Sequence, residues 1–77
     1  MDPIRSIDFG DRGCTDGVSS EFRSQIGTIE PGQVIEVVVR DPSARSDLPA
    51  MCRMLGHDIV SREESDGALR LRVMRGR

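Results

Sequence analysis

The chain has 77 residues and a mass of 8.5 kDa, which is room for one small domain, residues 1–77, and not for two separate cores. Its 11 arginines are outnumbered by 13 acidic residues, so the net charge is −2 and a strongly basic nucleic-acid binder is disfavoured. The longest uninterrupted hydrophobic runs, such as Val37–Val39, are far shorter than the roughly 20 residues of a membrane span. Because the first residues do not resemble a signal peptide, we expect a cytoplasmic protein.

The positive charges are all arginines, since the sequence contains no lysine. One interpretation is codon usage in a GC-rich genome, which replaces lysine by arginine throughout. The other is selection of individual arginines for the planar guanidinium, which binds a carboxylate or phosphate through two parallel hydrogen bonds. Both interpretations stay open, and the first is favoured.

The first half of the chain predicts a strand followed by a helix. Alternating hydrophobic and polar residues indicate a strand over residues 5–9. A hydrophobic stripe predicts a helix over residues 18–30, with Asp16 as its N-cap and Pro31–Gly32 beyond its end. The stripe consists of Val18, Phe22, Ile26 and Ile29.

The second half predicts a strand, a helix and a hairpin. A β-branched run over residues 33–40 is typical of a central strand, and Asp41–Pro42 ends it. A helix is expected from an N-cap at Asp47 to a C-terminal glycine at Gly56, with Pro49 in its first turn. The remaining residues predict two strands joined by an Asp-Gly turn. These strands cover residues 57–64 and 68–74.

This order of elements, βαβαββ, determines the expected fold class. Residues 68–74 alternate between hydrophobic and charged side chains, so one face of the sheet is core and the other faces water. We therefore expect an α+β protein, a two-layer α/β sandwich in which two helices pack on one face of a four-stranded mixed sheet.

The two cysteines occupy different parts of this pattern. Two are too few for a disulfide scaffold, so both are expected to be free thiols. Cys52 lies in the hydrophobic stripe of the second helix and is expected in the core. Cys14 lies just before the first helix, and a helix N-terminus lowers the pKa of a nearby thiol.

The neighbours of Cys14 along the chain act on its thiol in opposite directions. The positive charge of Arg12 favours the thiolate, whereas the carboxylate of Asp16 disfavours it. Gly13 and Thr15 complete this thiol environment. Two interpretations follow: Cys14 is a nucleophile, or it is an exposed thiol without a role.

Three further groups have a structural and a functional interpretation. His57 has no Cys or His partner at metal-ligand spacing, so no metal site is expected and a role at the helix end or strand start is favoured. Glu63 and Glu64 indicate a solvated strand end. Arg70 and Arg72 form a stripe on the water-facing side of the sheet, together with Arg62 and Arg40 from neighbouring strands. This stripe is a solvated face or, alternatively, a docking surface for an acidic partner or a tRNA backbone.

Several short motifs follow one another in a specific order and spacing. They are Pro31–Gly32, Asp41–Pro42, Asp47-Leu48-Pro49 followed by Cys52, and Gly56–His57. In this order and spacing the chain resembles the TusA/SirA-like sulfur-carrier family over about residues 7–75. That family has the same βαβαββ layout, which is similar to the C-terminal domain of bacterial translation initiation factor three.

The resemblance implies a function for Cys14. In the family, a cysteine in a Cys-Pro-x-Pro motif before the first helix carries sulfur as a persulfide and passes it to a partner protein. Here Thr15 and Gly17 stand in place of the two prolines, and the distance from Cys14 to Pro31 is about one residue longer. The role is therefore implied by position and not by the complete motif.

The resemblance also implies partners. A cysteine desulfurase-like protein would donate the sulfur and a second protein would accept it, with an indirect link to tRNA thiolation or sulfur metabolism, and no cofactor is expected. The alternative is a non-catalytic binding or regulatory module that keeps the fold without the transfer motif. An RNA-binding domain is less favoured, because base stacking has only two aromatic residues available.

Overall fold

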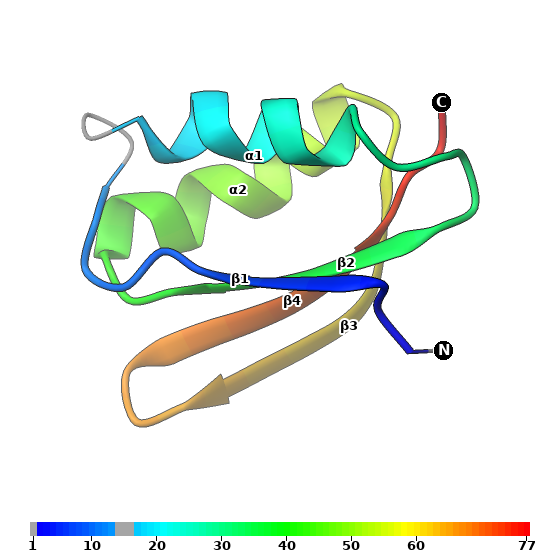
Figure 1. The fold of residues 1–77 in the computed structure, drawn as a ribbon. Coiled ribbons are helices and arrows are strands. Elements are labelled where there is room, and N and C mark those ends of the chain that lie inside the picture. Colours follow the sequence, from blue (N-terminus) through cyan, green and yellow to red (C-terminus); the bar gives the residue numbers. More distant parts are fainter. Residues whose placement is uncertain (1, 14–16) are drawn as a thin grey trace.

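The computed structural model describes residues 2–13 and 17–77 and contains six elements in the order βαβαββ (Figure 1). The sheet order is β1-β2-β4-β3, with β1 parallel to β2 and the other two pairings antiparallel. Both helices lie on the same face of this mixed sheet (Figure 1), so the expected fold class is confirmed. The elements are β1 (Arg5–Asp8), α1 (Val18–Ile26), β2 (Val34–Val39), α2 (Pro42–Met54), β3 (Asp58–Ser65) and β4 (Ala68–Met74).

The core lies between the sheet and the two helices. Alternate residues of the central strands β2 and β4 point toward the helices and are fully buried, as the strand period of two requires. The stripes predicted on both helices supply the other half of the core. The largest fully buried side chains are Phe9, which follows β1, Ile35, Leu69 and Leu71 of the sheet, and Phe22 and Leu48 of the helices.

The start of α2 differs from the prediction. The helix begins at Pro42 and not near Asp47, because Asp41 is its N-cap and accepts hydrogen bonds from the Ser43 and Ala44 amides at 2.9 and 3.2 Å. Pro42 needs no amide hydrogen in the first turn, so it starts the helix as readily as it ends the strand. Pro49 consequently lies inside the helix, where its side chain is buried.

The end of α2 follows the prediction. Gly56, with φ of +81°, adopts the left-handed conformation that terminates many helices, and its amide donates to the Arg53 carbonyl at 3.2 Å. The His57 amide donates to the Cys52 carbonyl at 2.9 Å, which completes a Schellman motif. His57 therefore links the helix end to the start of β3, as expected.

The helix α1 begins at Val18 as predicted, but its N-cap and its C-terminal end differ from the prediction. The helix stops at Ile26 instead of Glu30, although Ile29 is still buried in the core. Its N-cap is Gly17, which has no side chain to cap the first turn, and the proposed cap Asp16 lies outside the described residues. The predicted hydrophobic stripe therefore continues into the turn that follows the helix.

A β-bulge in β3 changes which face Arg62 occupies. Ile59 pairs with Val73 but Ser61 pairs with Arg72, so one extra residue, Val60, is inserted in β3. After the bulge, Arg62 pairs with the inward-facing Leu71. The prediction that Arg62 lies on the water-facing side with Arg70 was wrong, because the bulge moves it to the face that carries the helices.

Candidate functional site

The predicted nucleophile Cys14, with Thr15 and Asp16, lies outside the described residues. The structure describes the chain on both sides of them, from β1 through Gly13 and from Gly17 into α1. Along the sequence, Cys14 lies three residues before the N-cap of α1. Its role therefore stays a prediction, and the described geometry of the site is that of its two flanks.

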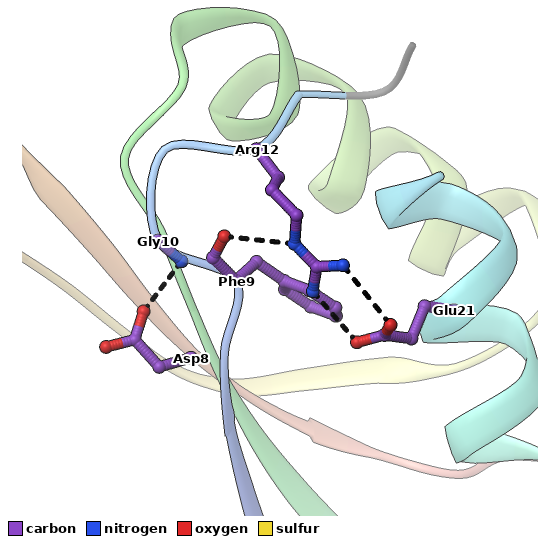
Figure 2. A network of polar contacts seen from close by, with 5 residues as sticks. All are labelled: Asp8, Phe9, Gly10, Arg12 and Glu21. Atoms are coloured by element: carbon purple, nitrogen blue, oxygen red, sulfur yellow. Dashed lines mark hydrogen bonds and ion pairs between the residues drawn. The ribbon is translucent and has the colours of Figure 1, made fainter. Parts of the chain in front are cut away.

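Arg12 links the two flanks of this loop (Figure 2). Its guanidinium pairs with the Glu21 carboxylate in the first turn of α1, with Nη2 3.0 Å from Oε2. The same group lies 5.3 Å from the centre of the Phe9 ring, and its Nε donates to the Phe9 carbonyl at 3.4 Å. Sequence reasoning identified Arg12 but missed Glu21, because a pair nine residues apart across a loop leaves no periodic signal.

The opposite charge of Glu21 changes what Arg12 can do. Both side chains are partly exposed, at 45% and 38%, so this ion pair contributes at most about 1 kcal/mol to stability. The Glu21 carboxylate offsets part of the positive charge that was expected to favour a thiolate at Cys14. The main effect of this contact is therefore to hold Arg12, at the base of the loop, against α1. It adds little net positive charge near Cys14.

Gly13 fixes the loop against α2. It is buried, and a Cβ atom built on it would lie 2.8 Å from Oδ2 of Asp41. That carboxylate is the N-cap of α2 and is held by donors from Ser43 and Ala44. Hydrogen bonds from the Ser43 hydroxyl and the Ala44 amide lower the pKa of Asp41, so it is ionised at neutral pH. Only glycine fits here without displacing the cap.

Cys52 has the surroundings of a core residue. Its side chain is fully buried, and it is the free cysteine among the described residues. Burial raises the pKa of its thiol to about 11, and the positive charge of Arg53 offsets only part of this effect. The expectation that Cys52 is structural is confirmed.

Arg70 and Arg72 lie on the sheet face that no helix covers. Between them lies Glu36, which accepts a hydrogen bond from Nε of Arg72 at 3.2 Å and lies 3.9 Å from Nε of Arg70. Burial raises the pKa of Glu36, but hydrogen bonds from Ser6 and Arg72 and the two arginine charges lower it by more. These two arginines are therefore partly neutralised by an acid on the neighbouring strand.

Arg40 lies on the same open face, as predicted. It lines a shallow hollow of about 300 Å³ together with Arg70. Acidic side chains line the hollow as well, so its charges are mixed. They are Asp8, Glu63 and Asp66.

His57 is held by the C-terminal segment. The Gly76 amide donates to its Nδ1 at 3.0 Å. Burial, together with the charges of Arg75 and Arg77, lowers the pKa of His57, so the imidazole is neutral at pH 7. Within residues 2–13 and 17–77, no three His, Cys, Asp or Glu side chains are arranged to hold a metal ion.

No helix in the described part of the chain is long and hydrophobic enough to span a bilayer.

The motifs that carry the family resemblance all have structural roles in the fold. Asp41–Pro42 starts α2, and Gly56–His57 ends it. Pro31–Gly32 forms the turn into β2, where Gly32 has φ of +91° and donates to the Arg75 carbonyl at 2.7 Å. The resemblance is thus strongest in residues that determine the fold.

Comparison with known proteins gives a consistent assignment. The sequence model of the family described as "Sulfurtransferase TusA" matches residues 21–75, a range that begins after Cys14. The "Sulfur carrier protein TusA" of Pseudomonas aeruginosa (strain LESB58) is 36% identical over 46 residues, which are 60% of this chain and 58% of that protein.

The protein of the same name from Pseudomonas fluorescens (strain SBW25) is 38% identical over 46 residues, 60% of this chain and 55% of the relative. The chain thus spans less than two thirds of the length of these curated relatives. The family match nevertheless covers most of the chain, from Glu21 within α1 to the end of β4. The chain belongs to the TusA family of sulfur carriers.

Proposed function

We propose that this protein accepts sulfane sulfur on Cys14 and passes it to a partner protein. The observation that carries the proposal is the burial of Cys52. Its thiol is enclosed in the core with a raised pKa, so it is unsuited to exchange sulfur with another protein. In a sulfur-carrier family member with two cysteines, the transfer role then falls to Cys14.

The proposed step is an exchange between sulfurs. The Cys14 thiolate attacks the outer sulfur of a cysteine persulfide on the donor, the donor's S–S bond breaks, and the donor cysteine leaves as a thiolate. Cys14 then carries the persulfide, and the acceptor removes its outer sulfur by the same reaction. Each transfer forms one S–S bond and breaks one, so it needs no external oxidant or reductant.

The flanks of the loop support this role. The N-terminus of α1 follows three residues after Cys14 and provides the positive end of a helix dipole. The contacts of Arg12 with Glu21 and of Gly13 with Asp41 restrain the loop base on one side. These contacts supply part of the restriction that two prolines would give in the complete motif.

The partners are proteins, and their class follows from the chemistry. The donor must present a persulfide, as a cysteine desulfurase-like enzyme does, and the acceptor must present a nucleophilic thiol. In this proposal the exchange takes place in the cytoplasm and feeds tRNA thiolation or sulfur metabolism. Arg70 and Arg72 are the proposed docking residues, because they lie exposed on the open sheet face.

A second function, a binding module without sulfur transfer, has one specific observation in its favour. The family match begins at Glu21 and leaves out the loop that contains Cys14. In that loop Thr15 and Gly17 replace the motif prolines. This alternative predicts a Cys14 thiol with an unperturbed pKa and no persulfide on the protein.

The test is transfer of labelled sulfur. The protein is incubated with a cysteine desulfurase and ³⁵S-cysteine, and the protein-bound label is measured before and after treatment with a thiol reductant. We expect reductant-labile label on the unaltered protein and on Cys52→Ser, and none on Cys14→Ser. Label that persists on Cys14→Ser, or never forms on the unaltered protein, contradicts the proposal.

A further inference from the structure

A second hollow lies between α2 and the edge strand β3, on the side of the molecule away from the open sheet face. It is an open hollow of about 490 Å³. Its lining is dominated by basic side chains, with a single acid among them. The lining residues are Arg45, Arg53, Arg62, Glu64, Pro42, Ser46 and Pro49.

Two features of the fold bring the three arginines together. Arg45, Pro49 and Arg53 are spaced by four residues along α2, so they form one row on the helix surface. Arg62 joins them from β3 because the bulge at Val60 moves it to the helix-bearing face. Without the bulge, Arg62 would point to the opposite side of the sheet and the hollow would have two arginines.

The charges of this hollow are unbalanced. One oxygen of Glu64, Oε1, serves two guanidiniums, at 3.3 Å from Nη2 of Arg62 and 3.9 Å from Nη2 of Arg45. The Arg53 guanidinium makes no hydrogen bond or ion pair with any described residue, although the Arg53 carbonyl accepts from the Gly56 amide. Three positive charges and one negative charge leave the hollow at +2 (3 − 1), in a chain whose net charge is −2.

One donor on an arginine that lines the hollow lacks an acceptor. The Nε atom of Arg45 is buried and has no hydrogen-bond partner among the described residues. A buried N–H group without an acceptor costs free energy that an incoming oxygen would recover. The hollow thus has unpaired donors as well as an excess of positive charge.

From these observations we infer that the hollow binds the phosphate group of a phosphate monoester. A monoester phosphate is a dianion near pH 7 and balances the charge of +2. It also offers three acceptor oxygens, enough for more than one guanidinium fork. A single carboxylate would leave the hollow at +1, with fewer acceptors. The space beyond the phosphate leaves room for the group that the ester carries.

The test is a titration followed by NMR. Adenosine monophosphate and, separately, inorganic phosphate are added at constant ionic strength, with chloride as the balancing anion. We expect saturable shifts of the Nε–H signal of Arg45 and of backbone amides of α2 and β3. Shifts that are absent, or that spread evenly over the molecule, overturn the proposal.

Variants of the lining residues test the site itself. Arg53→Gln and Arg62→Gln should each weaken binding of adenosine monophosphate by at least about fivefold, because each removes one charged donor. Glu64→Gln should strengthen binding by a similar factor, because it removes the competing carboxylate. Arg23→Gln, on the exposed side of α1, changes the net charge equally and should leave the affinity unchanged.

Two outcomes distinguish this site from general attraction of anions. If Arg23→Gln weakens binding as much as Arg62→Gln does, the attraction is diffuse and the site does not exist. If a single-stranded RNA oligonucleotide without a terminal phosphate binds and neither adenosine monophosphate nor phosphate does, the ligand is a polyanion and the monoester proposal is wrong. Arg23, Arg53 and Arg62 are all exposed, so the amide spectrum should show that the variants stay folded.

Discussion

Cys52 and the two described flanks of Cys14 lie in very different surroundings. Cys52 is enclosed by the helix stripe and the sheet, and its carbonyl ends α2 in a Schellman motif. Cys14 follows a loop base that is held by an exposed ion pair and by a glycine pressed against a helix cap. The chemistry of a thiol is thus determined by the backbone element that carries it. From residue type alone, Cys14 and Cys52 would be equivalent candidates for the thiol that carries sulfur.

The largest effect should be the difference in reactivity between the two thiols. Relative to the usual 9.0, a pKa of about 11 lowers the thiolate fraction of Cys52 about a hundredfold at pH 8, and burial slows it further. Iodoacetamide should therefore label Cys52→Ser, through Cys14, at least about a hundred times faster than it labels Cys14→Ser. Equal rates in the two folded variants would remove the basis for distinguishing the cysteines.

A cavity beside Cys52 should reduce the difference in labelling rate between the two cysteines. Leu48 lies one helical turn before Cys52 and is fully buried, so Leu48→Ala should cost about 2–5 kcal/mol of unfolding free energy. Cys52 would then be labelled faster, through more frequent opening of the core. Urea unfolding and labelling rates measure both effects. The control is Met54→Ala on the same helix, where the side chain is 84% exposed and the change should be small.

A smaller effect is expected at the loop base. Gly13→Ala places a methyl group against the Asp41 carboxylate and should cost about 1–3 kcal/mol, the usual range for an overpacked site. Thermal unfolding measures the loss. In an Asp41→Ser background, whose shorter side chain still caps a helix, the same substitution should cost less. Strictly additive effects would show that Gly13 and Asp41 do not interact.

The smallest effect concerns pH. Because burial and the charges of Arg75 and Arg77 lower the pKa of His57 in the folded state, the unfolded chain binds a proton more readily. The contribution of His57 to the free energy of unfolding has its full value above the ordinary pKa of 6.5. It is lost as the pH falls through the lower pKa of the folded state. Urea unfolding between pH 7.5 and 5.5 should show this slope. His57→Gln should flatten it, and an unchanged slope would assign it to other groups.

Much of the fold could be predicted from periodicity. The strand over residues 68–74 was predicted with its observed bounds, because its alternation of hydrophobic and charged side chains has one interpretation. The start of α2 could not be predicted in this way. Asp41–Pro42 is equally suited to a turn and to the first residues of a helix, and the capping bonds of Asp41 decide between them.

The site was less predictable than the fold, for physical reasons. Arg12 was found from its sequence neighbourhood, but its partner Glu21 meets it only when the loop folds back on α1. Arg62 was placed on the wrong face, since a bulge shifts the pairing by one residue and leaves no mark in composition. Contacts made across loops and irregular pairing are properties of the folded chain and not of any local segment.

The bulge at Val60 has one more consequence, for how the protein meets other chains. β3 is an outer strand of the sheet and would otherwise present a long row of unpaired backbone groups, to which a strand from a neighbouring molecule could add. The bulge interrupts that row, and the charged side chains of Arg62-Glu63-Glu64 disfavour pairing with a strand of another molecule. At the opposite edge, β1 has only four residues. Self-assembly into a continuous sheet is thereby disfavoured at both edges, and contacts with other chains must be made through side chains.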